Sequence, residues 1–146
     1  MNKENIDCYQ YLENDQRLIN QFYKQHKLNV SCNKLDHIFV ASYSVNSEST
    51  IIAALIVRPY QTQQNDILLM RSIYVHDNHR KKGIAKILIK LAFKNIKHNI
   101  YLLCQGDLMS FYSSIGMLPT EDKTDVRYIE QQIKKGLCLL HRPYKN

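Results

Sequence analysis

The sequence contains no tryptophan and is poor in the two residues that interrupt regular structure, with four glycines and three prolines in 146 residues. Disordered chains and collagens are rich in glycine or proline and poor in apolar residues, whereas 45% of this chain is hydrophobic. The composition therefore excludes both classes. A chain of this length supports one hydrophobic core and not two comfortable ones, so we expect a single domain over residues 1–146.

Long apolar runs and paired cysteines are also missing. No stretch approaches the roughly 18 consecutive apolar residues of a membrane span, and residues 1–10 lack the apolar core of a secretion signal. The cysteines form no C-x-x-C pair, so neither a zinc site nor a dense disulfide framework is indicated. They are Cys8, Cys32, Cys104 and Cys138. We expect a cytoplasmic protein with no metal and no membrane partner.

Acidic residues are the scarcer charge, with 13 Asp and Glu against 20 Lys and Arg, which gives a net charge of +7. Such a chain fits an anionic ligand or partner. Nucleic acid, an anionic membrane surface and a phosphorylated cofactor would all satisfy this condition. Charge alone therefore does not select among them.

Apolar periodicity predicts a mixture of strands and helices. The predicted strands cover residues 6–12, 36–44, 50–60, 66–75, 99–105 and 137–144, and the second and third of them form a hairpin across residues 45–49. The predicted helices begin after Asp15, which we expect to cap the first, and then cover residues from Gly83 onward, 107–116 and 126–136. This mixture predicts an α/β (α+β) domain built around one sheet.

The helix that follows Gly83 is amphipathic. Its apolar face is predicted to contain Ile84, Ile87, Leu88, Leu91, Ala92 and Ile96, and the opposite side to contain Lys82, Lys86, Lys90, Lys94 and Lys97. Lysines at this spacing are typical of any solvated helix face. They also allow a second hypothesis, a nucleic-acid-binding module whose helix tracks phosphates.

The start of this helix raises the question of an anion site. Arg80, Lys81 and Lys82 stand in its first turn, where the backbone already carries roughly half a unit of positive charge. Either the helix simply begins among exposed cations, or the turn prepares a pocket for an anion. Gly83 allows backbone amides to approach a ligand closely. Neither the Walker phosphate loop nor the dinucleotide G-x-G-x-x-G motif is present.

Residues 67–89, ILLMRSIYVHDNHRKKGIAKILI, resemble the core motif of the GNAT superfamily of acyl-CoA-dependent N-acyltransferases. Residues 80–85, RKKGIA, match every defined position of the family pattern [QR]-x-x-G-x-[GA]. A second family signature, an aromatic residue and tyrosine followed by a glycine, matches Phe111, Tyr112 and Gly116. The resemblance implies the GNAT fold, a mostly antiparallel central sheet with helices on both faces.

The resemblance also implies an N-acetyltransferase that transfers the acetyl group of acetyl-CoA to a primary amine by direct attack. Backbone groups of Ile73 and Val75 would bind the pantetheine arm, with Gln105 as a further contact. Tyr112 would act as general acid, because a phenol of pKa about 10 stays protonated at neutral pH. The pyrophosphate would be bound by Arg80, Lys81, Lys82, Gly83, Ile84 and Ala85.

The resemblance leaves the general base and the acceptor open. The glutamate that several family members carry in the strand at residues 66–75 corresponds to Leu69. The remaining candidates for the base are His37, His76, His79, Asp36 and Glu121, and His141 is expected to be a hydrogen-bonded structural histidine. The acceptor is expected to be a small-molecule or peptide amine, and a homodimer is compatible with the family. A catalytically idle acyl-CoA-binding regulatory domain is the alternative function.

Overall fold

The computed structural model describes residues 5–64 and 66–145. Residues 1–4, 65 and 146 lie outside the described residues. The predictions about a secretion signal and a single domain are therefore not examined at these positions. One seven-stranded sheet has the order β1-β2-β3-β4-β5-β7-β6, and β4 and β5 form its one parallel pair in the described chain. The strands are β1 (Asn5–Tyr11), β2 (His37–Val45), β3 (Glu48–Tyr60), β4 (Ile67–Val75), β5 (Ile100–Cys104), β6 (Leu118–Pro119) and β7 (Cys138–Arg142).

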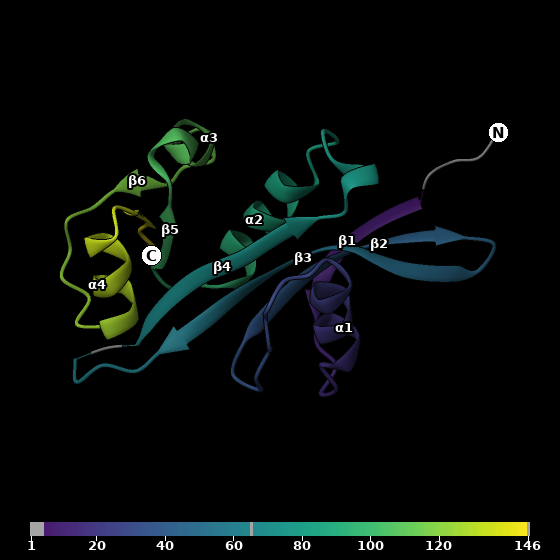
Figure 1. The fold of residues 1–146 in the computed structure, drawn as a ribbon, viewed down its shortest axis with the longest axis horizontal. Coiled ribbons are helices and arrows are strands. Elements are labelled where there is room, and N and C mark those ends of the chain that lie inside the picture. Colours follow the sequence, from purple (N-terminus) through teal and green to yellow (C-terminus); the bar gives the residue numbers. More distant parts are fainter. Residues whose placement is uncertain (1–4, 65, 146) are drawn as a thin grey trace.

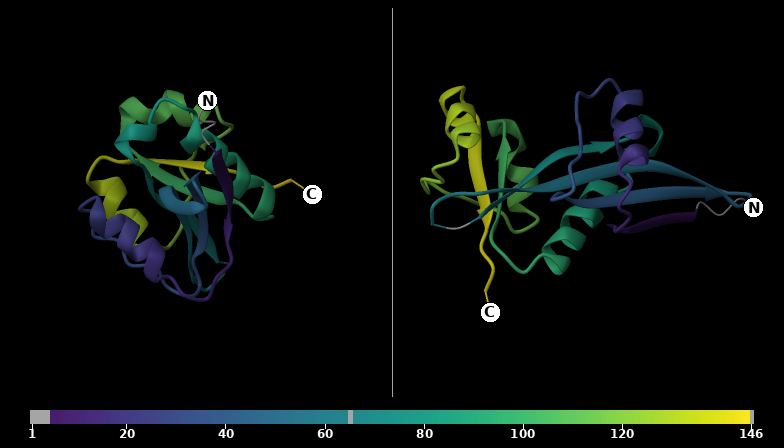
Figure 2. Two further views of the ribbon diagram at one scale, coloured as in Figure 1. Left: turned by 90° about the vertical axis from the view of Figure 1, so that its right-hand side faces the viewer. Right: turned by 90° about the horizontal axis from the view of Figure 1, so that it is seen from below.

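Helices cover both faces of the sheet. They are α1 (Arg17–Gln25), α2 (Ile84–Asn95), α3 (Met109–Ser113) and α4 (Arg127–Lys134), with short 3₁₀ turns at Asp77–His79 and Gly106–Leu108. Helices α1 and α4 pack on one face, and α2 packs on the other together with residues of α3 (Figures 1 and 2). The predicted mixed fold with a mostly antiparallel sheet and helices on both faces is confirmed. None of the helices in the described ranges is long and apolar enough to cross a membrane.

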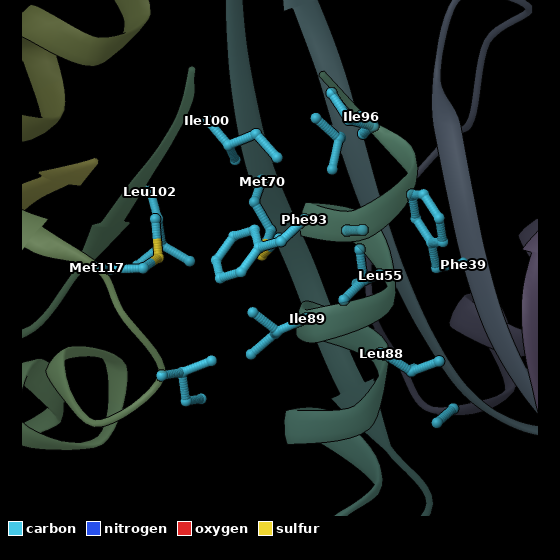
Figure 3. Packing of buried hydrophobic residues seen from close by; sticks show 14 of the residues in the cluster. Phe39, Leu55, Met70, Leu88, Ile89, Phe93, Ile96, Ile100, Leu102 and Met117 are labelled. Atoms are coloured by element: carbon cyan, nitrogen blue, oxygen red, sulfur yellow. The ribbon is translucent and has the colours of Figure 1, made fainter. Parts of the chain in front are cut away.

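The main core lies between α2 and the middle of the sheet (Figure 3). Leu88, Ile89 and Phe93 of α2 face strand residues such as Leu55 and Met70. The predicted apolar face was partly wrong. Ile87 is 50% exposed, whereas Ile89 is fully buried and Phe93 nearly so. The buried face of the helix is therefore rotated relative to the expected face, by about the angle between two successive residues.

Helix α1 forms a second core on the opposite face. Ile19, Phe22 and Tyr23 pack against β2 and β3, whereas Leu18 is 59% exposed. Gln16 is the N-cap residue, and the carboxylate of Asp15 accepts a hydrogen bond from the Arg17 amide at 3.0 Å. Asp15 therefore stabilises the start of α1, although it lies one residue before the N-cap position.

The hairpin predicted across residues 45–49 is confirmed. Asn46 and Ser47 have positive φ in the two-residue turn between β2 and β3, a conformation that matches the twist of a tight hairpin. Gly116 and Gly136, with φ of 105° and 101°, follow α3 and α4. The amide of Met117 donates to the Tyr112 carbonyl at 3.1 Å, which fixes the end of α3. Asp107 makes no capping hydrogen bond to α3.

The central strand β4 separates from its neighbour halfway along its length. Its register with β5 ends at the pair Met70 and Leu102. Beyond this pair its register with β3 shifts between Ala54 and Ile56, and Ser72 adopts a left-handed φ of 58°. An irregularity of this kind bends a strand, and Figure 1 shows β4 diverging from β5 beyond this point. The sheet therefore opens in its middle.

Candidate functional site

A cavity of about 410 Å³ lies where β4 ends and α2 begins, within the range of about 300–1,000 Å³ typical of small-molecule sites. Three segments form it: the end of β4, the turn that leads into α2, and α3. Its lining residues are Ile73, Tyr74, Val75, His79, Arg80, Lys81, Gly83, Ile84, Ala85, Lys86 and Phe111. Residues that the sequence placed in one cofactor site therefore do meet around one cavity.

Two of the predicted cofactor residues do not line it. Lys82 is exposed next to the lining residue Gly83, and Gln105 is exposed directly after β5. The sequence interpretation also missed Tyr74 and Lys86. Strand alternation turns the side chain of Tyr74 away from those of Ile73 and Val75, so the pattern contained no signal for it. Lys86 is four residues after Lys82, so helical spacing contained a weak signal for it.

The turn before α2 exposes backbone amides to the cavity. Gly83 has φ of +75°, and an added Cβ atom would meet no atom within 4 Å. The amide of Ile87 donates to the Gly83 carbonyl at 3.1 Å. The amides of Ile84, Ala85 and Lys86 precede this first helical bond, and none of them donates to a backbone carbonyl in the described part of the chain. Such a helix start attracts anions.

Arg80 ties this turn to the end of β4. Its Nε donates to the Val75 carbonyl at 3.1 Å, and its guanidinium lies 2.9 Å from the Asp77 carboxylate and 5.2 Å from the Tyr74 ring centre. Lys81, with a left-handed φ of 65°, and Lys86 are exposed cations that line the same cavity. The cations at the helix start therefore surround a hollow with free amides, an arrangement that favours an anion.

The aromatic pair of α3 divides between the cavity and the core. Phe111 lines the cavity, and its ring makes an edge-to-face contact with Tyr112 at 5.1 Å. Tyr112 is half-buried against the main core, and its hydroxyl forms no hydrogen bond with a described residue. Burial, and secondarily the nearby Cys104 thiol, raises the pKa of Tyr112 above its ordinary value. The phenol therefore keeps its proton, which a general acid requires.

The candidates for a general base lie in different places. Among them only His79 lines the cavity, where its ring is 6.0 Å from that of His76. His76 accepts a hydrogen bond from the Asn78 amide through Nδ1. Asp36 forms a two-point ion pair with Arg58. Asp36 is thus engaged with Arg58 and lines a different hollow.

The other candidates are further from the cavity lining. His37 is half-buried at the start of β2, where desolvation lowers its pKa, and it lines a different hollow. Glu121 is exposed in the segment after β6, and Leu69 is buried beneath α4. His141 was expected to be hydrogen-bonded, but its buried Nδ1 has no hydrogen-bond partner among the described residues and lies 4.0 Å from Asp122. Because residue 69 is a leucine, this position in β4 offers no carboxylate that could act as the base.

A sequence model of the acetyltransferase (GNAT) domain matches residues 34–116, more than half of the chain. The chain belongs to the GNAT acetyltransferase domain family. The match covers β2 to α3, which includes the whole cavity lining. A comparison with curated proteins finds no match.

Solved GNAT structures share the fold at low sequence identity. A GNAT-family acetyltransferase from Streptococcus pneumoniae matches with a TM-score of 0.65 and 12% identity, over 97% of this chain and all of its own. Arabidopsis thaliana NAA60, solved with a bisubstrate analogue, matches with a TM-score of 0.64 and 11% identity, over 97% of this chain and 99% of its own.

A third similar structure belongs to a longer protein. N-acetylglutamate synthase from Neisseria gonorrhoeae, complexed with coenzyme A and N-acetyl-glutamate, has a TM-score of 0.63 and 10% identity. The match covers 99% of this chain but only 36% of that synthase chain. At these identities the three likenesses support the fold, and they leave the acceptor to be argued from this chain's own residues.

Proposed function

We propose that this protein is an N-acetyltransferase that transfers the acetyl group of acetyl-CoA to a primary amine. The observation that carries this proposal is the cavity beside Gly83, where free amides and cations lie within one hollow together with the end of β4. The coenzyme A present in the solved N-acetylglutamate synthase supports acetyl-CoA as the donor.

The binding of the donor follows from the chemistry of the lining. The amides of Gly83, Ile84 and Ala85 would donate to the pyrophosphate, and Arg80 and Lys81 would add electrostatic attraction, as would Lys82 at the rim. The end of β4, freed from β5, would offer the backbone of Ile73 and Val75 to the pantetheine arm, with Gln105 on the other side of the opening.

In the transfer itself, the neutral amine attacks the thioester carbonyl carbon while both substrates are bound. A carbon–nitrogen bond forms, the carbon–sulfur bond breaks, and the thiolate takes a proton from Tyr112 while the amine nitrogen loses one. Because the pKa of Tyr112 is raised above its ordinary value of 10.0, loss of the phenol proton should not reduce the rate below about pH 10.

For the proton leaving the amine, His79 is the base candidate with the best position, because it lines the cavity. With Leu69 where relatives carry a glutamate, no carboxylate is assigned to this step. An amine that arrives neutral still loses one proton after the attack, and solvent water could accept that proton in place of a side chain.

The test is a thiol-release assay with acetyl-CoA and amines of several classes, combined with calorimetric titration of acetyl-CoA. The proposal predicts saturable binding and coenzyme A formation that depends on an amine. Binding without transfer to any amine would favour the idle acyl-CoA-binding domain. Absence of binding would contradict both functions.

A further inference from the structure

The face of β4 opposite the cavity carries an arginine, Arg71, that has no acidic partner among residues 5–64 and 66–145. Met70 points into the main core on the α2 side, and the next residue, Arg71, therefore projects between α1 and α4. Its Nη1 donates to the Tyr60 hydroxyl at 2.6 Å, and its guanidinium lies over the Tyr128 ring at 4.9 Å. These contacts place Arg71 beside α4, on the first residue after β4 and β5 cease to pair.

Two tyrosines hold the guanidinium in a fixed position. The rings of Tyr60 and Tyr128 are parallel to within 1° and 6.2 Å apart, and both pack against the small core beneath α4. Tyrosine packed in this way has little rotamer freedom to lose when a ligand binds. The position of Arg71 is therefore prepared before any ligand arrives, which reduces the entropic cost of binding.

Two other arginines of the described chain are half-buried. Arg142, like Arg71, has only neutral contacts, but it lies opposite Ile100 at the start of β5 and not where the pairing with β4 ends. Arg58 forms a two-point ion pair with Asp36, and Arg142 donates to the Phe93 carbonyl and covers the Phe93 ring. Arg71 has five N–H donors, but the described residues provide one neutral phenol as acceptor. The remaining donors of Arg71 are available to an anionic ligand.

The local charge indicates which anion would fit. Arg58 lies on the same face of β3, opposite Leu69, but Asp36 already neutralises it. Arg71 therefore contributes one uncompensated positive charge. A planar monoanion that accepts two parallel N–H bonds suits one guanidinium, and a carboxylate has this geometry. Polyamines and other polycations would instead be repelled by a like charge at the opening.

We propose that Arg71 is the specificity-determining residue of the acceptor site and that the acceptor is an amino acid, whose carboxylate it binds. This inference rests on the proposed function. Arg71 lies two residues before Ile73, which lines the donor cavity on the other face of β4, so an amine anchored on Arg71 would lie across the strand from the donor. Tyr60 and Tyr128 act as positioning residues for the guanidinium.

The test compares each of the standard L-amino acids with its own carboxamide as acceptor in the thiol-release assay. The carboxamide has the less basic amine, so intrinsic reactivity favours it. The inference predicts the reverse, a preference for the acid of about tenfold or more in kcat/KM, as expected for a charged hydrogen bond. Equal use of acid and carboxamide, or transfer to no amino acid, would overturn it.

Substitution separates recognition from support of the fold. In Arg71→Gln, KM for the acid should rise about 10- to 100-fold while KM for the carboxamide stays nearly constant. Arg71→Lys keeps the charge but loses the two-point geometry, so it should fall between wild type and Arg71→Gln. Arg142→Gln is the matched control, because it removes an equally half-buried arginine from the α2 side, and it should retain the preference for the acid.

Two further comparisons decide between a role of Arg71 in recognition and a role in supporting the fold. An equal loss for acid and carboxamide in Arg71→Gln would mean that the arginine only supports the tyrosine pair, which would overturn the inference. If that variant does not fold, the wild-type comparison and Arg71→Lys still decide. Calorimetry with acetyl-CoA on the same proteins distinguishes the two proposals, since normal donor binding with no acid preference rejects the inference and leaves the proposed function standing.

Discussion

The functional residues on the two faces of β4 come from the chain in different ways. On the α2 side, almost the whole cavity lining comes from one continuous stretch, residues 73–86, and only Phe111 is distant in sequence. On the α1 and α4 side, Arg71 meets Tyr60 of β3 and Tyr128 of α4, which come from separate elements. A site made from one stretch keeps its geometry through local backbone structure. A site made from several elements can change its specificity without disturbing the other face.

The largest expected effect tests the α2 side. Tyr112→Phe should lower kcat about 100- to 10,000-fold, the usual contribution of a general acid, because the thiolate loses its proton donor. Affinity for acetyl-CoA should change little, since the ring and its packing remain. Steady-state kinetics and calorimetry measure the two quantities. Phe111→Leu is the control for the aromatic pair, and a loss of kcat in that variant equal to the loss in Tyr112→Phe would remove the acid role from Tyr112.

The next effect tests the opposite side. Arg58→Ala should lower the free energy of unfolding by about 3 kcal/mol, because it leaves the Asp36 carboxylate buried without its partner. Acetyl-CoA affinity of the folded variant should be unchanged, since the pair lies away from the cavity. Denaturant unfolding and calorimetry provide these values. Arg17→Ala breaks an exposed ion pair and should produce no measurable change in stability.

A smaller effect distinguishes backbone geometry from binding on the α2 side. Gly83→Ala and Gly136→Ala both place an alanine at a positive φ with open space around the new Cβ, so each should cost about 1 kcal/mol of stability. Only Gly83→Ala should weaken acetyl-CoA binding, by about tenfold, because only that turn must keep its shape for the ligand. Equal acetyl-CoA affinity in the two variants would contradict the assignment of the turn.

The smallest effect concerns pH on the α1 side. Desolvation lowers the pKa of His37 below its ordinary value of 6.5, although Asp36 opposes the shift. The folded state therefore disfavours the protonated ring, so this contribution to stability is complete above pH 6.5 and is lost as the pH falls through the folded-state pKa. Denaturation midpoints between pH 8 and pH 5 should fall less for His37→Gln than for wild type. Parallel pH profiles would contradict this.

The sequence predicted the fold and the α2 side well because both depend on local patterns. Strand periodicity placed β2, β3 and β4 within a residue or two, and the glycine at residue 83 indicated the turn before α2. The two-residue strand β6 escaped prediction because it is too short to show any period. Ile87 was assigned to the core and is exposed, because spacing alone does not say which edge of an apolar stripe meets the sheet.

The acceptor side was beyond sequence reasoning for a physical reason. Nothing in the sequence near Arg71 distinguishes it from a surface arginine, since its contacts lie 11 residues before it, at Tyr60, and far after it, at Tyr128. The absence of a carboxylate partner is a property of the folded chain. The assignment of Gln105 rests on the family resemblance alone, and this residue lies outside the cavity lining.

The most direct test of the central claim is a titration of the ¹⁵N-labelled protein with coenzyme A, followed through its amide resonances. If the turn before α2 receives the diphosphate of a thioester carrier, saturable shifts should concentrate at Gly83, Ile84 and Ala85, and Gly83→Ala should need about tenfold more ligand. Unchanged resonances in this turn at millimolar coenzyme A would contradict the account.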